Sequence, residues 1–282
     1  MNKPVMTKTK KRLLFIWSPL FLLYILSLIT GFMLQTTTYE IYSDKIDDEI
    51  RIVLITDLHN TVFGKNQKQL IGRIKDSNPD LILLAGDIFH DYGSRDGAHM
   101  LMEGIQGLAP AYFVTGNHDL SNREISLILN EVTSYGITIL SDSFEEIEIK
   151  GNRIIVAGID DPVKGYNHKI EMQRAFGELH EKGGYKILLA HRPEDINYYT
   201  EHPFDLVVSG HAHGGQVFVP FINRGLYVPH QGILAEYAGG LYEHGTLTHI
   251  VSRGLSIKHP SPIIPRVNNR PELVVISVKS AN

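Results

Sequence analysis

Short apolar runs that end in Asp, His or Asn limit the fold of this chain more than any other feature of its sequence. Beyond residue 50, the runs "RIVLIT", "DLILLA", "AYFVT", "KILLA" and "DLVVS" lead into "DLHN", "GDIFHD", "GNHD", "HRPE" and "GHAHGG". The early runs are rich in Ile, Val and Leu without strict alternation, which is typical of strands buried on both faces. The sequence therefore predicts a sheet with polar side chains gathered at its strand ends.

Segments of helical length separate these runs. Apolar residues at helical spacing predict helices over residues 66–77, 122–136 and 168–184, and Gly136 is suited to ending the second. The alternation of strands and helices predicts an α/β fold. Residues 225–270 are rich in Gly, Pro, His and Tyr. We expect them to form long loops around one or two strands, over the mouth of the site.

The N-terminus has the composition of a membrane anchor. Residues 1–12 carry five basic side chains and no acid, and residues 13–35 carry no charge. At about 1.5 Å per residue, the uncharged run is long enough to span roughly 30 Å of hydrocarbon. A cleavable signal peptide has a shorter apolar region and a small-residue cleavage site, and "GFMLQTTTYE" has no A-x-A pattern. We predict an uncleaved single-pass transmembrane helix.

The charge of the N-terminus also predicts the orientation of the chain. Lys and Arg beside a membrane span keep that end in the cytoplasm. The predicted organisation is a cytoplasmic basic segment (1–12), a transmembrane anchor (13–35), a linker (36–50) and a single folded domain (51–282). We therefore expect a protein of the cell membrane whose folded domain lies on the extracytoplasmic side.

The composition excludes several function classes. The formal net charge of the 282 residues is −4, so a basic surface for nucleic acid is not expected. The chain has no cysteine, which excludes disulfides, thiolate metal sites and cysteine nucleophiles.

The polar residues at the strand ends form a set of potential metal ligands. Carboxylates, imidazoles and one amide without sulfur suit Mn, Fe, Zn, Co or Ni, and ligands bind at the carboxyl edge of α/β sheets. The set is too large for one ion and divides between two if one carboxylate bridges them. Taken singly, Asp57 is also compatible with a helix cap, Asp87 with a turn and Asn117 with a left-handed turn. The predicted ligands are Asp57, His59, Asp87, Asn117, His191, His211 and His213.

The motifs D-L-H, G-D, G-N-H-D, A-H and G-H-A-H resemble, in order and spacing, those of the calcineurin-like metallophosphoesterase superfamily. The resemblance runs from about Arg51 to the C-terminus. The "GHAHGGQ" form, the "GIDDP" turn and the predicted anchor are most similar to the membrane-anchored bacterial phosphodiesterase branch. The resemblance implies a four-layer sandwich in which two mixed β-sheets are flanked by helices.

The resemblance also implies a role for each residue. Asp57, His59 and His213 would hold the first metal ion. Asn117, His191 and His211 would hold the second, and Asp87 would bridge the two. His118 would lie beside the scissile phosphate, where it donates a hydrogen bond or protonates the leaving oxygen, and Asp119 would orient its ring.

The implied function is a metal-dependent hydrolase that cleaves phosphoester bonds, above all phosphodiesters, at the extracytoplasmic membrane surface. The nucleophile would be a hydroxide bound to two divalent metal ions. Lipids, cell-envelope polymers and extracellular nucleotides all remain candidate substrates. Two alternatives stay open, namely a pyrophosphatase acting on a lipid-linked nucleotide and a catalytically inactive metal-binding membrane protein. Protein phosphatases match less well, because "IFHDYGSRD" follows Asp87 where they carry G-D-x-x-D-R-G.

Several other polar residues have weaker predicted roles. Asp160 and Asp161 of "GIDDP" are expected to shape a turn behind the site. His90, His230 and His244 are expected on surface loops.

Overall fold

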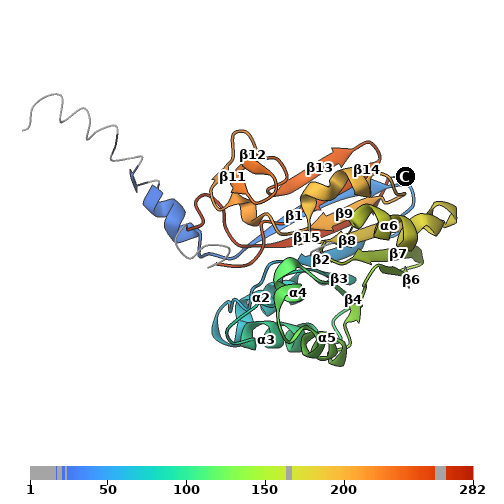
Figure 1. Ribbon diagram of the computed structural model, residues 1–282, viewed down its shortest axis with the longest axis horizontal. Helices are drawn as coiled ribbons and strands as arrows, with labels where there is room; N and C mark the ends of the chain where they lie inside the picture. Colours follow the sequence, from blue (N-terminus) through green and yellow to red (C-terminus); the bar gives the residue numbers. More distant parts are fainter. Residues whose placement is uncertain (1–16, 18–20, 23, 163–166, 258–264, 282) are drawn as a thin grey trace, which may run out of the picture.

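Two mixed β-sheets pack face to face and are covered by helices on their outer sides, as the computed structural model in Figure 1 shows. The structure describes residues 17, 21–22, 24–162, 167–257 and 265–281. This architecture confirms the predicted α/β sandwich of two mixed sheets flanked by helices.

The first sheet has six strands and contains the N-terminal half of the predicted site. Its strands β2 to β5 are parallel, whereas β15 pairs antiparallel with β2 and parallel with β1. In spatial order the strands are β1 (Gln35–Ser43), β15 (Glu272–Ser280), β2 (Ile50–Ile55), β3 (Leu81–Ala85), β4 (Ala111–Val114) and β5 (Thr138–Ile139).

The second sheet also has six strands and contains the C-terminal half of the site. Its strands β14, β9, β8 and β7 are parallel, with an antiparallel strand at each edge. In spatial order the strands are β13 (Gly240–His244), β14 (Leu247–Val251), β9 (Leu206–Ser209), β8 (Tyr185–Ala190), β7 (Asn152–Ile159) and β6 (Ser143–Ile149).

The predicted helices form the outer layers. Three longer helices cover the first sheet, namely α2 (Lys68–Asp76), α3 (Asp96–Ile105) and α5 (Ile125–Ser134). Helices α6 (His168–Phe176) and α7 (Ile196–Tyr199) cover the second. The predicted helices over 66–77, 122–136 and 168–184 are confirmed with shorter α-helical cores. The short elements are α4 (Asn117–Ser121) and the 3₁₀ turns η1 (Lys65–Gln67), η2 (Gly177–Glu181), η3 (Pro193–Asp195) and η4 (His213–Gly215).

The largest apolar core explains why the strand runs do not alternate. Leu54 and Leu83 of the first sheet pack against Val156 and Leu189 of the second. The other faces of the same strands pack against helices, so all five residues of β3 are buried. Parallel strands covered on both sides need apolar side chains at every position, as the sequence pattern predicted.

A small antiparallel sheet lies beside the sandwich and corrects one prediction. It contains β10 (Phe218–Val219), β11 (Arg224–Val228) and β12 (Gly232–Ala235). The prediction of one or two strands within residues 225–270 was wrong, because β11 to β14 all fall largely inside this range. Gly and Pro at the turns hid strands that are only four or five residues long.

The N-terminal region differs from its prediction in one respect. Residues 36–50, expected as a linker, include most of β1, which pairs with β15 along its whole length. Part of the predicted anchor (13–16, 18–20 and 23) lies outside the described residues. Among the residues that are described, no helix combines the length and the apolar character needed to cross a membrane.

Candidate metal centre

Strand ends from both sheets meet at one edge of the sandwich. Asp57 and Asp87 follow β2 and β3 in the first sheet, and Asn117 begins α4 after β4. His191 and His211 follow β8 and β9 in the second sheet. Because the carboxyl ends of parallel strands lie at the same edge of each sheet, residues far apart in sequence converge there.

The convergence brings the predicted residues into two groups of potential metal ligands. Asp57, His59 and His213 form one group, and Asp87, His191 and His211 form another, each with ligand atoms within 4.8 Å of one another. In the first group, His213 Nε2 lies 3.3 Å from both Asp57 Oδ1 and His59 Nε2. Asn117 lines the same pocket as Asp87, His211 and His213. The structure thus brings together all seven predicted ligands.

Asp87 lies between the two groups. Its Oδ2 atom is 3.2 Å from His191 Nε2 in the second group and 3.6 Å from His59 Nε2 in the first. Its Oδ1 atom accepts a hydrogen bond from the backbone N–H of His118. A carboxylate in this position can contact two neighbouring cations, which is the bridging role predicted for it.

The donor atoms of the second group fit a bound cation. Asn117 Oδ1 and His211 Nε2 are buried and make no hydrogen bond within the described part of the chain. His191 Nδ1 lies 2.8 Å from the carbonyl oxygen of Ala85, which can only accept, so Nδ1 carries the proton. His191 Nε2 faces Asp87 at 3.2 Å, and although burial lowers the pKa of His191, Asp87 raises it to about 10. A bound cation would take the place of the proton at Nε2.

Backbone strain accompanies this convergence. Asp57, His59, Asp87, His211 and His213 all have φ between 45° and 66°. Side chains other than glycine rarely adopt this region, and such residues cluster at functional sites. The strand-end turns therefore hold a conformation that the surrounding packing imposes, and they aim several ligands at one point.

Two glycines make room for the carboxylates. A Cβ atom on Gly116 would lie 2.2 Å from Asp87 Oδ1, and one on Gly210 would lie 2.4 Å from Asp57 Oδ2. Real Cβ contacts are never this short, so any side chain at these positions would displace a ligand. This explains the glycines that precede Asn117 and His211.

Gly116→Ala is expected to lower the metal content of the purified protein, because its new methyl group displaces Asp87. The measurement is metal per chain by mass spectrometry. Gly72→Ala is the matched control, since nothing lies within 4 Å of its added Cβ and alanine favours helix α2 by about 1 kcal/mol. Metal content equal to that of the Gly72 variant would contradict the crowding of Asp87.

The charge state of the pocket also suits cations. Burial, with the nearby charge of Asp87, raises the pKa of Asp57 to about 6. Burial lowers the pKa values of His211 and His213 well below the ordinary range. These imidazoles are therefore neutral, the form that binds metal, while the carboxylates gain from a nearby positive charge.

The structure corrects the role predicted for Asp119. Its carboxylate accepts hydrogen bonds from the backbone N–H groups of Asp87, Phe89 and Gly116, so it fixes the loop that carries Asp87. The ring of His118 is instead held by Asp91, whose Oδ1 lies 3.2 Å from Nδ1. With Nδ1 held there, Nε2 is the nitrogen of His118 that is available to a substrate.

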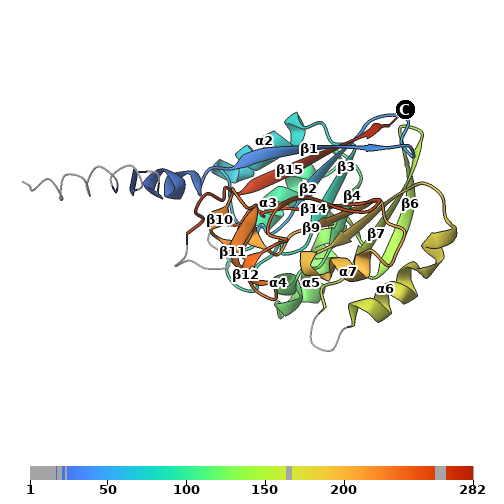
Figure 2. The same cartoon turned by 90° about the horizontal axis from the view of Figure 1, so that it is seen from above.

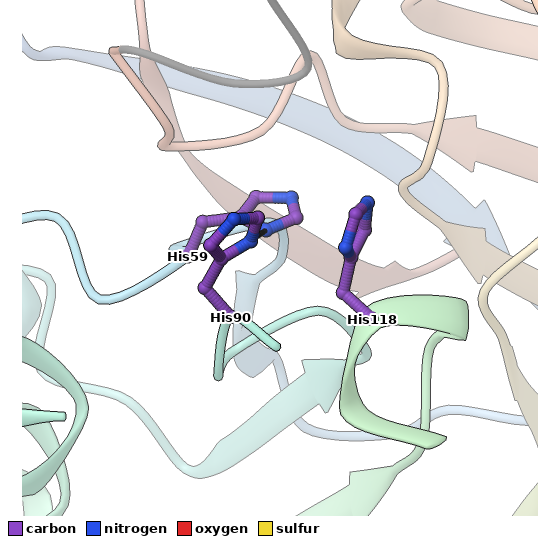
Figure 3. A group of neighbouring side chains, drawn as sticks. All are labelled: His59, His90 and His118. Carbon is purple, nitrogen blue, oxygen red and sulfur yellow. Dashed lines mark hydrogen bonds between the residues drawn. The ribbon is translucent and has the colours of Figure 1, made fainter. Parts of the chain in front are cut away.

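His90 is a residue that the sequence analysis placed on the surface and the structure buries. Figure 3 shows its ring beside those of His59 and His118, and the three ring centroids lie 4.8 to 5.2 Å apart. Its Nδ1 lies 3.2 Å from His59 Nδ1, and its ring centroid is 5.0 Å from that of His118. His230, by contrast, is exposed and lines the pocket. His90 thus supports both a predicted ligand and the predicted catalytic histidine.

Arg192 is a pocket residue that sequence reasoning missed. Its guanidinium makes two hydrogen bonds to Asp161, at 2.7 and 3.0 Å, and the residue lines the pocket beside His118 and His211. Asp161 therefore acts on the site through Arg192, in agreement with the supporting role predicted for the "GIDDP" turn. The only sequence signal was the position of Arg192 directly after His191.

Comparisons with known proteins agree with this geometry. The model of the calcineurin-like phosphoesterase family matches residues 50–215. The uncharacterized metallophosphoesterase YkuE of Bacillus subtilis is 29% identical over 89% of this chain and 87% of its own length. A metallophosphoesterase of Helicobacter pylori is 32% identical over 76% of this chain, which spans 56% of that protein. Phosphodiesterase YaeI of Escherichia coli is 26% identical over 81% of this chain and 82% of its own length.

Proposed function

The chain belongs to the calcineurin-like phosphoesterase family and is a metal-dependent phosphoester hydrolase, and on that premise we propose that it cleaves phosphodiesters at a membrane surface. The observation that carries the proposal is the position of Asp87, with one oxygen facing His59 in one ligand group and His191 in the other. The relative named phosphodiesterase supports the choice of a diester.

In this proposal the first ion would be held by Asp57, His59 and His213 and the second by Asn117, His191 and His211, and Asp87 would serve both. When bound, two divalent ions would neutralise phosphoryl oxygens and supply a nucleophile from water at neutral pH. The ligand set suits Mn, Fe, Zn, Co or Ni.

The remaining pocket residues act on the substrate. His118 donates from Nε2 to the phosphoryl group or protonates the leaving oxygen, while Asp91 holds Nδ1. Arg192 places a positive charge at a fixed position in the pocket, because two of its nitrogens donate hydrogen bonds to the Asp161 carboxylate. The guanidinium is suited to binding a phosphate oxygen before and during the reaction.

Metal removal tests the proposed function. The full-length protein in detergent should hydrolyse bis-p-nitrophenyl phosphate with added Mn²⁺, lose this turnover after chelation, and recover it when Mn²⁺ returns. The monoester p-nitrophenyl phosphate should be the poorer substrate. Turnover of the monoester alone would contradict the diester assignment, and no turnover with any divalent ion would contradict the function as a whole.

We also propose that residues 13–35 anchor the protein in the cell membrane with its catalytic domain outside the cytoplasm. The basic residues 1–12 and the uncharged stretch that follows support this orientation. Protease added to cells without their wall should digest the domain, and protection of the domain would contradict the orientation.

A further inference from the structure

An apolar projection stands beside the metal centre. We call residues 218–235 the finger; they form β10, β11, β12 and the turns between them. Phe221 at the β10–β11 turn is 97% exposed and Ile233 is 77% exposed. The large exposed apolar side chains of the finger are Phe221, Ile222, Leu226, Tyr227, Ile233 and Leu234. Such a cluster marks an interaction surface, since single exposed apolar residues are ordinary but contiguous ones are not.

The apolar side chains cover both faces of the finger as well as its tip. Tyr227 and Ile233 lie opposite each other on paired strands and therefore share a face. Leu226 and Leu234 occupy the alternate positions, which point to the other face, and both are exposed. A flat protein interface would cover one face only. Apolar side chains at the tip and on exposed parts of both faces are suited to a bilayer interface, which can contact a projection from more than one side.

The charge of the finger agrees with a lipid environment. Between Val217 and Ala235 the sequence has one charged residue, Arg224, and no acid. The guanidinium of Arg224 lies 3.6 Å from Glu236, directly after the finger. The surface of the finger therefore carries little net charge and enters the bilayer interface at low cost.

The finger lies at the end of the molecule where the N-terminal helix emerges, as both views show (Figure 1, Figure 2). The hydroxyl of Ser27 in that helix accepts a hydrogen bond from the backbone N–H of Asn268. The side chain of Asn268 in turn donates to the carbonyl oxygen of Phe218, at 3.2 Å. Phe21, Leu26, Ile29, Phe32 and Met33 are exposed along and just after the helix. The finger therefore continues an apolar surface that begins in the predicted anchor.

The finger also forms one wall of the metal-centre pocket. Tyr227, Pro229 and His230 line that pocket together with Asp87 and His118. A membrane that contacts the tip of the finger would therefore lie close to the opening of the site. The phosphate group of a lipid at the bilayer surface could reach the pocket while the acyl chains of that lipid stay in the membrane.

We propose that the finger inserts into the lipid bilayer and that the enzyme acts on phosphoesters of membrane lipids. The substrate part of this inference rests on the phosphodiesterase function proposed above, whereas the insertion of the finger does not. The bilayer contact is separate from the N-terminal anchor, because it depends on side chains of residues 221–234.

The absence of cysteine from the chain allows a direct test of insertion. Phe221→Cys and Ile233→Cys, each labelled with a polarity-sensitive dye, would report on the finger in full-length protein reconstituted into phosphatidylcholine nanodiscs. The matched controls are Leu127→Cys and Ile170→Cys, which are exposed on α5 and α6. Nitroxide-bearing lipids should quench the two finger dyes severalfold more than the controls.

Two results would overturn insertion. Equal quenching of all four dyes by aqueous iodide would place the finger in water. Protection from iodide without quenching by nitroxide lipids would show that the finger contacts protein, such as a second copy of the chain.

The substrate class is tested with Phe221, Ile222 and Ile233 replaced together by serine. None of the three lines the pocket, so turnover of soluble bis-p-nitrophenyl phosphate should stay at the wild-type level. Vesicles of phosphatidylcholine with phosphatidylglycerol, both of which are phosphodiesters, should compete with this substrate in the wild type. Competition should weaken at least about tenfold in the triple variant, because burying one large apolar side chain already accounts for that factor.

The outcomes separate the two proposals. Vesicles that fail to compete in the wild type would overturn the lipid-substrate inference while leaving the phosphodiesterase function intact. Absence of soluble turnover in the wild type would overturn the proposed function, while the quenching pattern would still decide whether the finger enters the membrane.

Discussion

Asp87→Asn is expected to abolish turnover of bis-p-nitrophenyl phosphate through the loss of both metal ions. The Oδ2 atom of Asp87 faces His59 and His191, one from each ligand group. Asparagine is neutral and offers one oxygen in place of two, and that oxygen cannot serve both ions and the backbone N–H of His118. Loss of several kcal/mol of transition-state stabilisation corresponds to a drop in kcat of roughly a thousandfold or more.

The number of metal ions bound per chain and kcat are both measured on the same preparation. Asp80→Asn is the matched control, because Asp80 lies just before the opposite end of β3 and pairs with Lys150 on the surface. Asp80→Asn should keep both metal ions and its turnover. If Asp87→Asn loses only one ion, Asp87 is a terminal ligand of a single metal and the bridging role is wrong.

The ligand groups could be predicted from the sequence because each motif follows a strand. Hydrophobic runs locate the strands, and the topology of parallel sheets places their carboxyl ends at a common edge. The seven predicted ligands depended on that rule together with the family motifs. The positive φ angles of Asp57, Asp87 and His211 show that strained backbone turns aim these side chains at the site. Residue spacing in the sequence does not reveal such turns.

Contacts between side chains that are remote in sequence could not be predicted in this way. Asp119 is adjacent to His118 in the chain, yet the helical turn directs its carboxylate toward the backbone of residues 87 and 89. Asp91, on the loop after a different strand, reaches the His118 ring instead. Adjacency in sequence suggested the wrong partner, because neighbouring residues in a helix point in different directions.

The finger shows a second limit of sequence reasoning. Its strands are as short as two residues, and its apolar side chains face outward rather than into a core. A pattern search interprets apolar residues as buried, so for residues 225–270, which include most of the finger, the sequence predicts only long loops around one or two strands. The three-dimensional arrangement was needed to show that these residues form one exposed surface beside the pocket.

His118→Ala is expected to lower kcat by about 10²- to 10⁴-fold while the metal content stays that of the wild type. The ring of His118 lines the pocket and is held at Nδ1 by Asp91. It lies in a third cluster of potential ligands, with His59 and His90, and not in the two groups that Asp87 connects. His99→Ala is the control, since this histidine lies on α3 beside Glu131 and does not line the pocket. Loss of metal from His118→Ala would show that the residue is a ligand.

The leaving group distinguishes the two roles open to His118. p-Nitrophenolate leaves readily without a proton, whereas an alkoxide needs one in the transition state. If His118 protonates the leaving oxygen, His118→Ala should lower kcat far more with a dialkyl phosphodiester such as glycerophosphocholine, which releases an alkoxide, than with bis-p-nitrophenyl phosphate. Equal losses for both substrates would instead assign His118 to the phosphoryl group. In that case its hydrogen bond stabilises the charge on the equatorial oxygens, in common with Arg192, and the leaving oxygen must take its proton from water.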